Sequence, residues 1–159
     1  MTSDPWPFRL LHTHSWYSLL EGVSSPDALL ARTAACGYPA LALTDTNNLY
    51  GAVQFTQAAA QHGVRPLLGA CLRQERTRCV ALIAEPAGWR NLCRVLTRLH
   101  LSENMRLAEL LAKYAEGLHV LVDDLVLAER LREAFGPRLW LEIVRPGPGN
   151  RGRRANEQR

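Results

Sequence analysis

The feature of this sequence that most constrains its fold is an alternation of helical segments with short apolar runs. Ser25-Pro26-Asp27 combines an N-cap residue, a proline at the first helical position and an acid in the first turn. A helix should therefore begin there and end at Gly37. The run 39–45 that follows is apolar up to its last two residues, which predicts a buried strand. Strands that alternate with helices in this way indicate an α/β fold with a parallel sheet or barrel.

The same alternation continues along the chain. We expect further strands at residues 8–11, 65–72, 78–84, 118–122 and 138–144, and further helices at 50–62, 86–100, 105–115 and 125–135. The connection 74–77 is so short that the two strands beside it should pair as a hairpin. Residues 1–144 are expected to form one domain, and the Gly/Pro/Arg-rich residues 145–159 a disordered tail.

Composition excludes several classes of protein. A chain of 159 residues with 47% hydrophobic content can bury the core of one globular domain. The sequence lacks an apolar run of the roughly 18 residues that a membrane span needs, and we expect a cytoplasmic protein with no membrane partner. The cysteines show no paired C-x-x-C spacing, which argues against a disulfide framework and against a zinc knuckle. They are Cys36, Cys71, Cys79 and Cys93.

The net charge of +4 does not predict a nucleic-acid-binding face. Residues 143–159 hold five arginines and one glutamate, so this segment carries the whole excess and the rest of the chain is balanced. A tail of this kind is ordinarily solvated, and an arm that binds polyanions is the alternative. We therefore expect any contact with DNA to be indirect.

Two histidines follow the first apolar run. In an extended segment side chains alternate between faces, so His12 and His14 should point the same way, about 7 Å apart along the strand. Two imidazoles at this spacing can reach one metal ion, and Glu21 can return a carboxylate to the same place after a turn at Gly22. A pair of surface histidines on a loop is the other interpretation.

Polar residues also stand at the carboxyl ends of later expected strands, where α/β sheets and barrels gather their functional groups. Asp45, Cys71 and Asp124 are the candidates that could converge with the histidines on one cleft. Each has a structural alternative. Asp45 and Asp124 are also suited to capping a turn or a helix, and Cys71 to filling space in the core.

Several motifs, in order, resemble a known family. They are His12-Thr13-His14-Ser15, Leu19-Leu20-Glu21-Gly22, Leu43-Thr44-Asp45, Asn48-Leu49-Tyr50-Gly51, Pro66-Leu67-Leu68-Gly69 and Asn91-Leu92-Cys93-Arg94. With them, residues 8–142 resemble the PHP domain (polymerase and histidinol phosphatase domain) of the bacterial DNA polymerase III alpha subunit and the error-prone DNA polymerase. The resemblance implies a distorted (β/α)7 barrel, here incomplete at its C-terminus. In active members the barrel rim binds up to three zinc, manganese or iron ions and hydrolyses phosphoesters.

The match at the metal-binding positions is partial. His12, His14 and Glu21 stand at ligand positions of the family, but Thr46 replaces a histidine and Cys71 a bridging glutamate. Asp124 stands where the family has a later cysteine and could substitute as an oxygen ligand. The family's final Asp-x-His motif is not found in the sequence. A thiolate binds zinc but does not bridge hard metals as a carboxylate does, so any bound divalent ion should be held weakly.

Three functions remain open from the sequence. The first is a catalytically degenerate PHP domain, a structural and interaction module whose partner is the remainder of a DNA polymerase III alpha-type polymerase. The second is an active metal-dependent phosphoesterase of the exonuclease or pyrophosphatase type, with His12, His14, Glu21, Cys71 and Asp124 as ligands and Asp45 as a catalytic residue that orients a ligand or a water. The third is an α/β binding domain in which the histidines serve another purpose.

Overall fold

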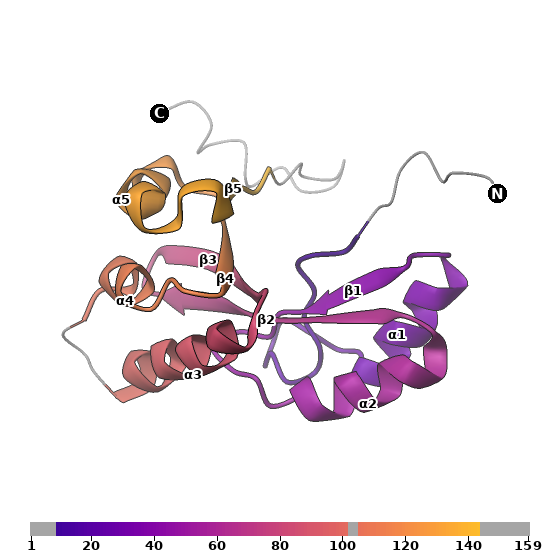
Figure 1. Cartoon of the computed structure of the whole chain (residues 1–159). Helices are drawn as coiled ribbons and strands as arrows, with labels where there is room; N and C mark the ends of the chain where they lie inside the picture. Colours follow the sequence, from indigo (N-terminus) through magenta and orange to yellow (C-terminus); the bar gives the residue numbers. More distant parts are fainter. Residues whose placement is uncertain (1–8, 102–104, 144–159) are drawn as a thin grey trace, which may run out of the picture.

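A computed structural model describes residues 9–101 and 105–143 (Figure 1). The expected tail at 145–159 lies outside the described residues. The helices are α1 (Pro26–Ala35), α2 (Ala52–His62), α3 (Pro86–Leu101), α4 (Leu107–Lys113), α5 (Leu125–Phe135) and the short 3-10 helix η1 (Gly136–Arg138). The strands are β1 (Ala40–Leu43), β2 (Arg65–Gln74), β3 (Thr77–Ile83), β4 (Leu118–Val122) and β5 (Leu139–Leu141). The predicted α/β class is confirmed.

The strands form one sheet in the order β1-β2-β3-β4-β5. The pairs β1/β2 and β4/β5 are parallel, whereas β3 runs antiparallel to both of its neighbours. The expected hairpin between β2 and β3 is therefore confirmed, and the sheet is parallel in its two outer pairs and antiparallel around β3. The physical reason is the two-residue connection, because a parallel pair needs a crossover of a dozen or more residues.

The first described segment lies beside β1. Leu10 forms a parallel bridge with Leu41, and the Ala42 N–H donates to the Leu10 carbonyl at 2.7 Å. Three residues further on, the Thr44 N–H donates to the Thr13 carbonyl at 2.9 Å. This segment is thus extended as predicted, although it pairs through an isolated bridge and not as a full strand. It places His12 and His14 next to the carboxyl end of β1.

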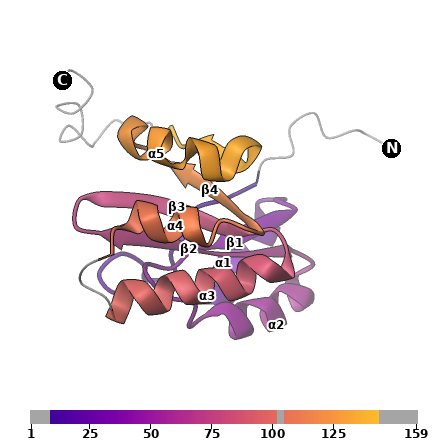
Figure 2. The same ribbon diagram turned by 60° about the vertical axis from the view of Figure 1, so that its left-hand side comes forward.

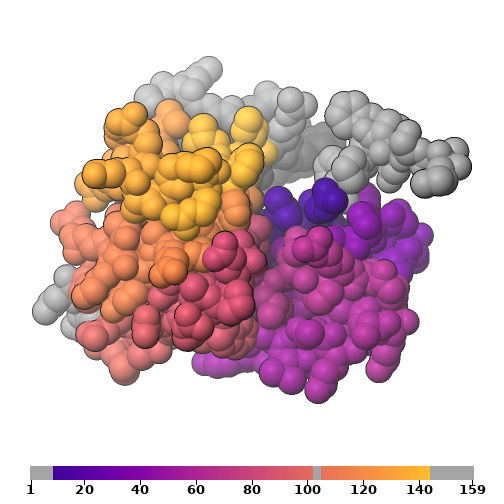
Figure 3. Space-filling model, in the orientation of Figure 1, coloured from indigo at the N-terminus to yellow at the C-terminus, as the bar shows by residue number. Residues whose placement is uncertain are grey.

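Two groups of helices cover the sheet in separate places (Figures 1 and 2). Helices α1 and α2 pack on β1 and the start of β2, with Leu30, Leu41 and Phe55 fully buried between them. Helices α3, α4 and α5 pack on β2, β3 and β4 around a larger core that includes Leu92 and Leu131. In the space-filling view these two halves lie side by side (Figure 3). Of the described helices, none has both the length and the apolar character needed to cross a membrane.

The last expected strand is shorter than the sequence suggested. Residues 138–144 were expected to be extended, but η1 takes up Arg138 and β5 ends at Leu141. Pro137 fixes its own φ in the helical range and favours this tight turn. The backbone nevertheless stays beside β4 for one more residue, because the Glu142 N–H donates to the Val122 carbonyl at 2.7 Å. Glu142 is thereby held at the same end of the sheet as the histidines.

The β2–β3 hairpin contains a strained residue that can be tested. Glu75 has a φ of 53°, in the left-handed region that disfavours side chains with a Cβ. We expect Glu75→Gly to raise the free energy of unfolding by about 0.5–1 kcal/mol in urea titrations. Arg76→Gly is the matched control, since Arg76 is not among the positive-φ residues of the described chain and glycine there only adds entropy to the unfolded state. Equal destabilisation by both variants would contradict the assignment of strain.

Candidate metal centre

Three of the predicted ligands meet at one point. The Nε2 atoms of His12 and His14 are 3.1 Å apart, and the donor atoms of these residues and of Cys71 all lie within 4.8 Å of one another. Cys71 comes from β2, where it bridges to Thr46 and is 0% exposed. Among the described residues this is the one group of three or more His, Cys, Asp and Glu side chains gathered closely enough to hold an ion.

His12 is oriented by a residue from the far end of the chain. Its Nδ1 lies 2.6 Å from Oε1 of Glu142, and this contact turns Nε2 toward the other two donors. Hydrogen bonds to the Cys71 sulfur and to Glu142 raise the pKa of His12 from 6.5 to about 9, against the opposing effect of burial. A carboxylate behind a ligating histidine is the usual arrangement that fixes the ring of a metal ligand.

His14 is oriented through a serine. Its Nδ1 lies 3.1 Å from the Ser18 hydroxyl, which donates to Asp45 at 2.6 Å and accepts from the Thr46 N–H at 3.0 Å. Because Ser18 uses its proton on Asp45, His14 must donate from Nδ1, and this leaves its Nε2 lone pair facing the other donors. Burial and the charge of His12 lower the pKa of His14, which favours the neutral, ligating form.

Asp45 anchors the loop that carries Ser18. It is 1% exposed and also accepts from the backbone N–H and the hydroxyl of Ser15, both at 2.7 Å. The loop then turns back at Gly22, where a Cβ would stand 1.9 Å from the Ser15 carbonyl oxygen, so a larger residue would not fit. These contacts give Asp45 a positioning role. The catalytic role predicted for it remains a prediction.

Glu21 lies next to the three donors, but both of its oxygens are engaged. Oε1 pairs with Arg73 at 2.5 Å, and Oε2 accepts from the Thr46 hydroxyl at 2.5 Å. The Thr46 hydrogen bond and Arg73 hold the pKa of Glu21 below its usual value. Its Oε2 also lies 3.9 Å from Nδ1 of His14. Glu21 is therefore placed beside the centre and tied to an internal cation.

A second arginine engages the other carboxylates. Arg78 on β3 stands directly opposite Arg73 on β2, so two like charges face each other across the hairpin. Like charges in this position are destabilising unless each has a partner. Arg78 pairs closely with Asp123 and lies 4.0 Å from Oε2 of Glu142. The arginine pair thus neutralises carboxylates from three separate segments of the chain.

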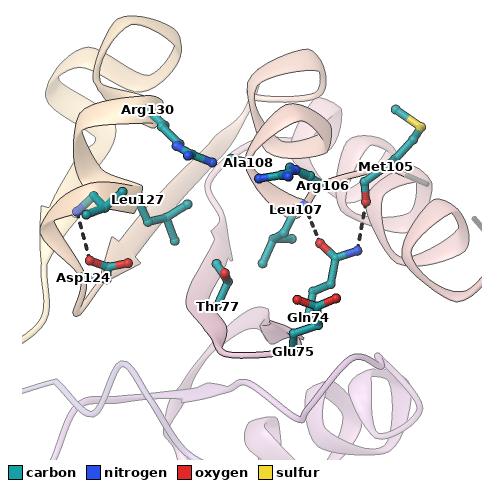
Figure 4. A pocket seen from close by; sticks show the side chains of 11 residues that line it. Gln74, Glu75, Thr77, Met105, Arg106, Leu107, Ala108, Asp124, Leu127 and Arg130 are labelled. Atoms are coloured by element: carbon teal, nitrogen blue, oxygen red, sulfur yellow. Dashed lines mark hydrogen bonds between the residues drawn. The ribbon is translucent and has the colours of Figure 1, made fainter. Parts of the chain in front are cut away.

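The structure does not bring Asp124 to the other predicted ligands. Its side chain accepts from the Val126 N–H at 2.9 Å and caps α5, and it lines a different cavity (Figure 4). Neighbouring residues in an extended segment point in opposite directions. Asp123 takes the inward direction, toward Arg78, and the expectation that Asp124 joins the cleft is therefore not met.

Sequence reasoning missed three residues of this centre. Glu142, Arg73 and Arg78 were not singled out, although all three stand near the ends of expected strands. A signal for Glu142 was present, because it is an acid at the carboxyl end of the last strand. The two arginines carried a weaker signal, since their role depends on the register of the β2–β3 hairpin.

The donor set fits a particular class of ion. Two imidazole nitrogens and one thiolate sulfur suit zinc and related metals in tetrahedral geometry. The separation of 3.1 Å between the two Nε2 atoms is close to the roughly 3.3 Å that Zn–N bonds of about 2.0–2.1 Å give at a tetrahedral angle. Among the described residues, the carboxylates next to this set are those of Glu21 and Glu142, and both are engaged by arginines, so neither is available to bridge to a second ion.

Comparison with known proteins places this chain in a family. The family model described as PHP domain matches residues 11–144. An error-prone DNA polymerase of Symbiobacterium thermophilum is 45% identical over 100 residues, which are 62% of this chain and 9% of that protein. A DNA polymerase III subunit alpha of Chlamydia pneumoniae is 38% identical over 128 residues, 68% of this chain and 10% of that protein.

A solved amidohydrolase from Chromobacterium violaceum is also similar, with a TM-score of 0.44 and 33% identity, covering 55% of this chain and 32% of that one. This chain spans about a tenth of the length of the two polymerases that it matches.

The role of Asp45 leads to a stability prediction. Asp45→Ala would leave the Ser15 N–H and two hydroxyls without their buried acceptor, so we expect a loss of about 3 kcal/mol in the free energy of unfolding. Asp27→Ala, which removes an exposed ion pair with His62, should cost at most about 0.5 kcal/mol. Urea unfolding of the two variants measures the difference. Similar values for both would show that Asp45 does not anchor the loop.

Proposed function

Because the chain belongs to the PHP domain family, we propose that it is a catalytically degenerate PHP domain. It serves as a structural and interaction module of a DNA polymerase III alpha-type or error-prone polymerase, in DNA replication or repair. Its place of action is the cytoplasm, and it meets DNA only through the rest of the polymerase.

One observation carries this proposal. The two carboxylates closest to the three donors, Glu21 and Glu142, are engaged by Arg73, Thr46, His12 and Arg78. Hydrolysis by a two-metal site needs ions about 4 Å apart, held by bridging groups, so that one activates water and both neutralise the developing phosphoryl charge. Here arginine guanidinium groups neutralise the carboxylates in place of metal ions. The arrangement of charges around His12, His14 and Cys71 therefore favours a folded site without a metal cluster.

At most one divalent ion belongs to this proposal. His12, His14 and Cys71 would hold it, and the sulfur favours zinc or iron over manganese. Such an ion would join the segment before β1 to β2 and so reinforce contacts that the protein already makes. Its contribution is structural.

The interaction role is supported by exposed apolar side chains at the edge of the sheet. Trp140, Leu141 and Ile143 are 54%, 58% and 84% exposed on and just after β5. Leu141 and Ile143 are two residues apart and so point to the same side of this extended segment, and exposed apolar side chains at a sheet edge favour packing by another protein. The relatives are polymerases about ten times longer than this chain, so the remainder of such a polymerase is the partner we propose.

A second candidate function is a phosphoesterase that uses a single ion. The observation in its favour is that three protein donors leave the fourth tetrahedral position open, as in catalytic zinc sites. An ion there would lower the pKa of a bound water and supply a nucleophile. The same three residues would hold it.

Two assays on the full chain separate these functions. With zinc or manganese added, we expect hydrolysis of bis(p-nitrophenyl) phosphate to be no faster than with the His12→Ala/His14→Ala variant. Turnover well above that variant would contradict degeneracy and support the single-ion phosphoesterase.

The interaction role is tested by binding to an alpha-type polymerase from which its own PHP domain has been deleted. Trp140→Ala/Ile143→Ala should weaken this binding at least about tenfold, since exposed aromatic residues often dominate interfaces. Val53→Ala is the matched control, because Val53 is 67% exposed on α2, in the other half of the molecule. Absence of binding, or equal weakening by both variants, would refute the interaction role proposed for β5.

A further inference from the structure

A cavity of about 560 Å³ lies outside the metal centre. The tip of the β2–β3 hairpin and the first turns of α4 and α5 form its walls (Figure 4). The cavity is separated from the three metal donors because successive side chains of β2 point to opposite faces of the sheet. Cys71 and Arg73 face those donors, whereas Leu72 packs in the core under α3 and α4 and Gln74 points into the cavity. The β2–β3 hairpin thus separates this cavity from the candidate metal centre.

Two arginines converge at the mouth of the cavity. The side chains of Arg106, just before α4, and Arg130, on α5, extend toward each other in Figure 4. Within 9–101 and 105–143, no carboxylate forms an ion pair with either of them. Two guanidinium groups that face each other repel unless an anion lies between them, and their planar forks match the oxygens of a phosphate or carboxylate.

Both arginines are attached to rigid parts of the fold. The Gln74 side chain donates to the Met105 carbonyl at 2.9 Å and accepts from the Leu107 N–H at 2.7 Å, so it holds the backbone on both sides of Arg106. Arg130 stands one turn after Leu127, which is 3% exposed and fixes this face of α5 in the core. The backbone that carries each arginine is therefore held in place by the fold.

The opposite wall carries negative charge. Asp124 and Glu75 line the cavity below the arginines in the view of Figure 4, together with the Thr77 hydroxyl. Only one oxygen of Asp124 is used to cap α5. A ligand that is anionic at both ends would meet repulsion here, whereas a ligand with an anionic head and an amino group would be complementary to both walls.

We propose that this cavity binds a small zwitterionic phosphate ester. The phosphate lies between Arg106 and Arg130, and the amino group lies against Asp124. This site takes no part in the function proposed for the chain, and none of its residues belongs to the metal centre.

The test is isothermal titration of the full chain with O-phosphoethanolamine and, separately, with inorganic phosphate. For a ligand of this size we expect a dissociation constant of about 1 mM for phosphoethanolamine and weaker binding of inorganic phosphate. Arg106→Gln/Arg130→Gln should weaken phosphoethanolamine binding at least about tenfold. Arg132→Gln is the matched control on the same helix, because Arg132 is exposed, pairs with Glu129 and does not line the cavity.

A further variant tests the amino-group contact separately. Asp124→Asn keeps a good N-cap for α5, so the fold should persist. It should weaken the binding of phosphoethanolamine and leave that of inorganic phosphate unchanged. No saturable binding, or equal weakening by Arg132→Gln and the double variant, would overturn the site. Equal effects of Asp124→Asn on the two ligands would overturn the zwitterion assignment.

Discussion

The contact between His12 and Glu142 connects the first described segment of this chain to its last strand. It spans 130 positions in sequence at 2.6 Å, and the arrangement of the rim depends on it. Through it, the extended segment before β1 meets the end of β5, so the two edges of the sheet approach each other. The same contact orients His12 toward His14 and Cys71, and it places Glu142 within reach of Arg78. The His12–Glu142 contact therefore both brings the two edges of the sheet together and orients the candidate metal ligands.

Charge balance decides what such a rim can do. Metal-dependent phosphoesterases leave carboxylates free to share between ions, and the ions in turn offset their repulsion. In this chain Arg73 and Arg78 supply the positive charge from β2 and β3, side by side. The carboxylates of this site then have positively charged partners within the protein. A buried thiol in the third donor position, at Cys71, adds to this by favouring one soft ion over a pair of hard ones.

Much of this could be predicted from the sequence, and the reasons are physical. The helix signals at Ser25 and Gly37 and the apolar run before Asp45 are local, and the elements they predicted are present. The meeting of His12 and His14 with Cys71 was expected from the rule that polar strand ends share one edge, although β2 continues past Cys71 to Gln74. The register of the strands was harder to predict from the sequence. Whether Asp123 or Asp124 faces inward depends on a shift of one residue, and the Arg73/Arg78 pair depends on the pairing of the hairpin. Long-range partners such as Glu142 have no local signature.

The carboxylates beside His12, His14 and Cys71 already have internal cations, so we expect this centre to hold at most one ion. Metal content by mass spectrometry tests it most directly, on untagged protein dialysed against zinc or manganese, with His12→Ala/His14→Ala beside it. We expect up to one equivalent of zinc, little manganese, and loss of the zinc in the double variant. Two or more equivalents of either metal, lost in that variant, would contradict it and would indicate a working metal cluster.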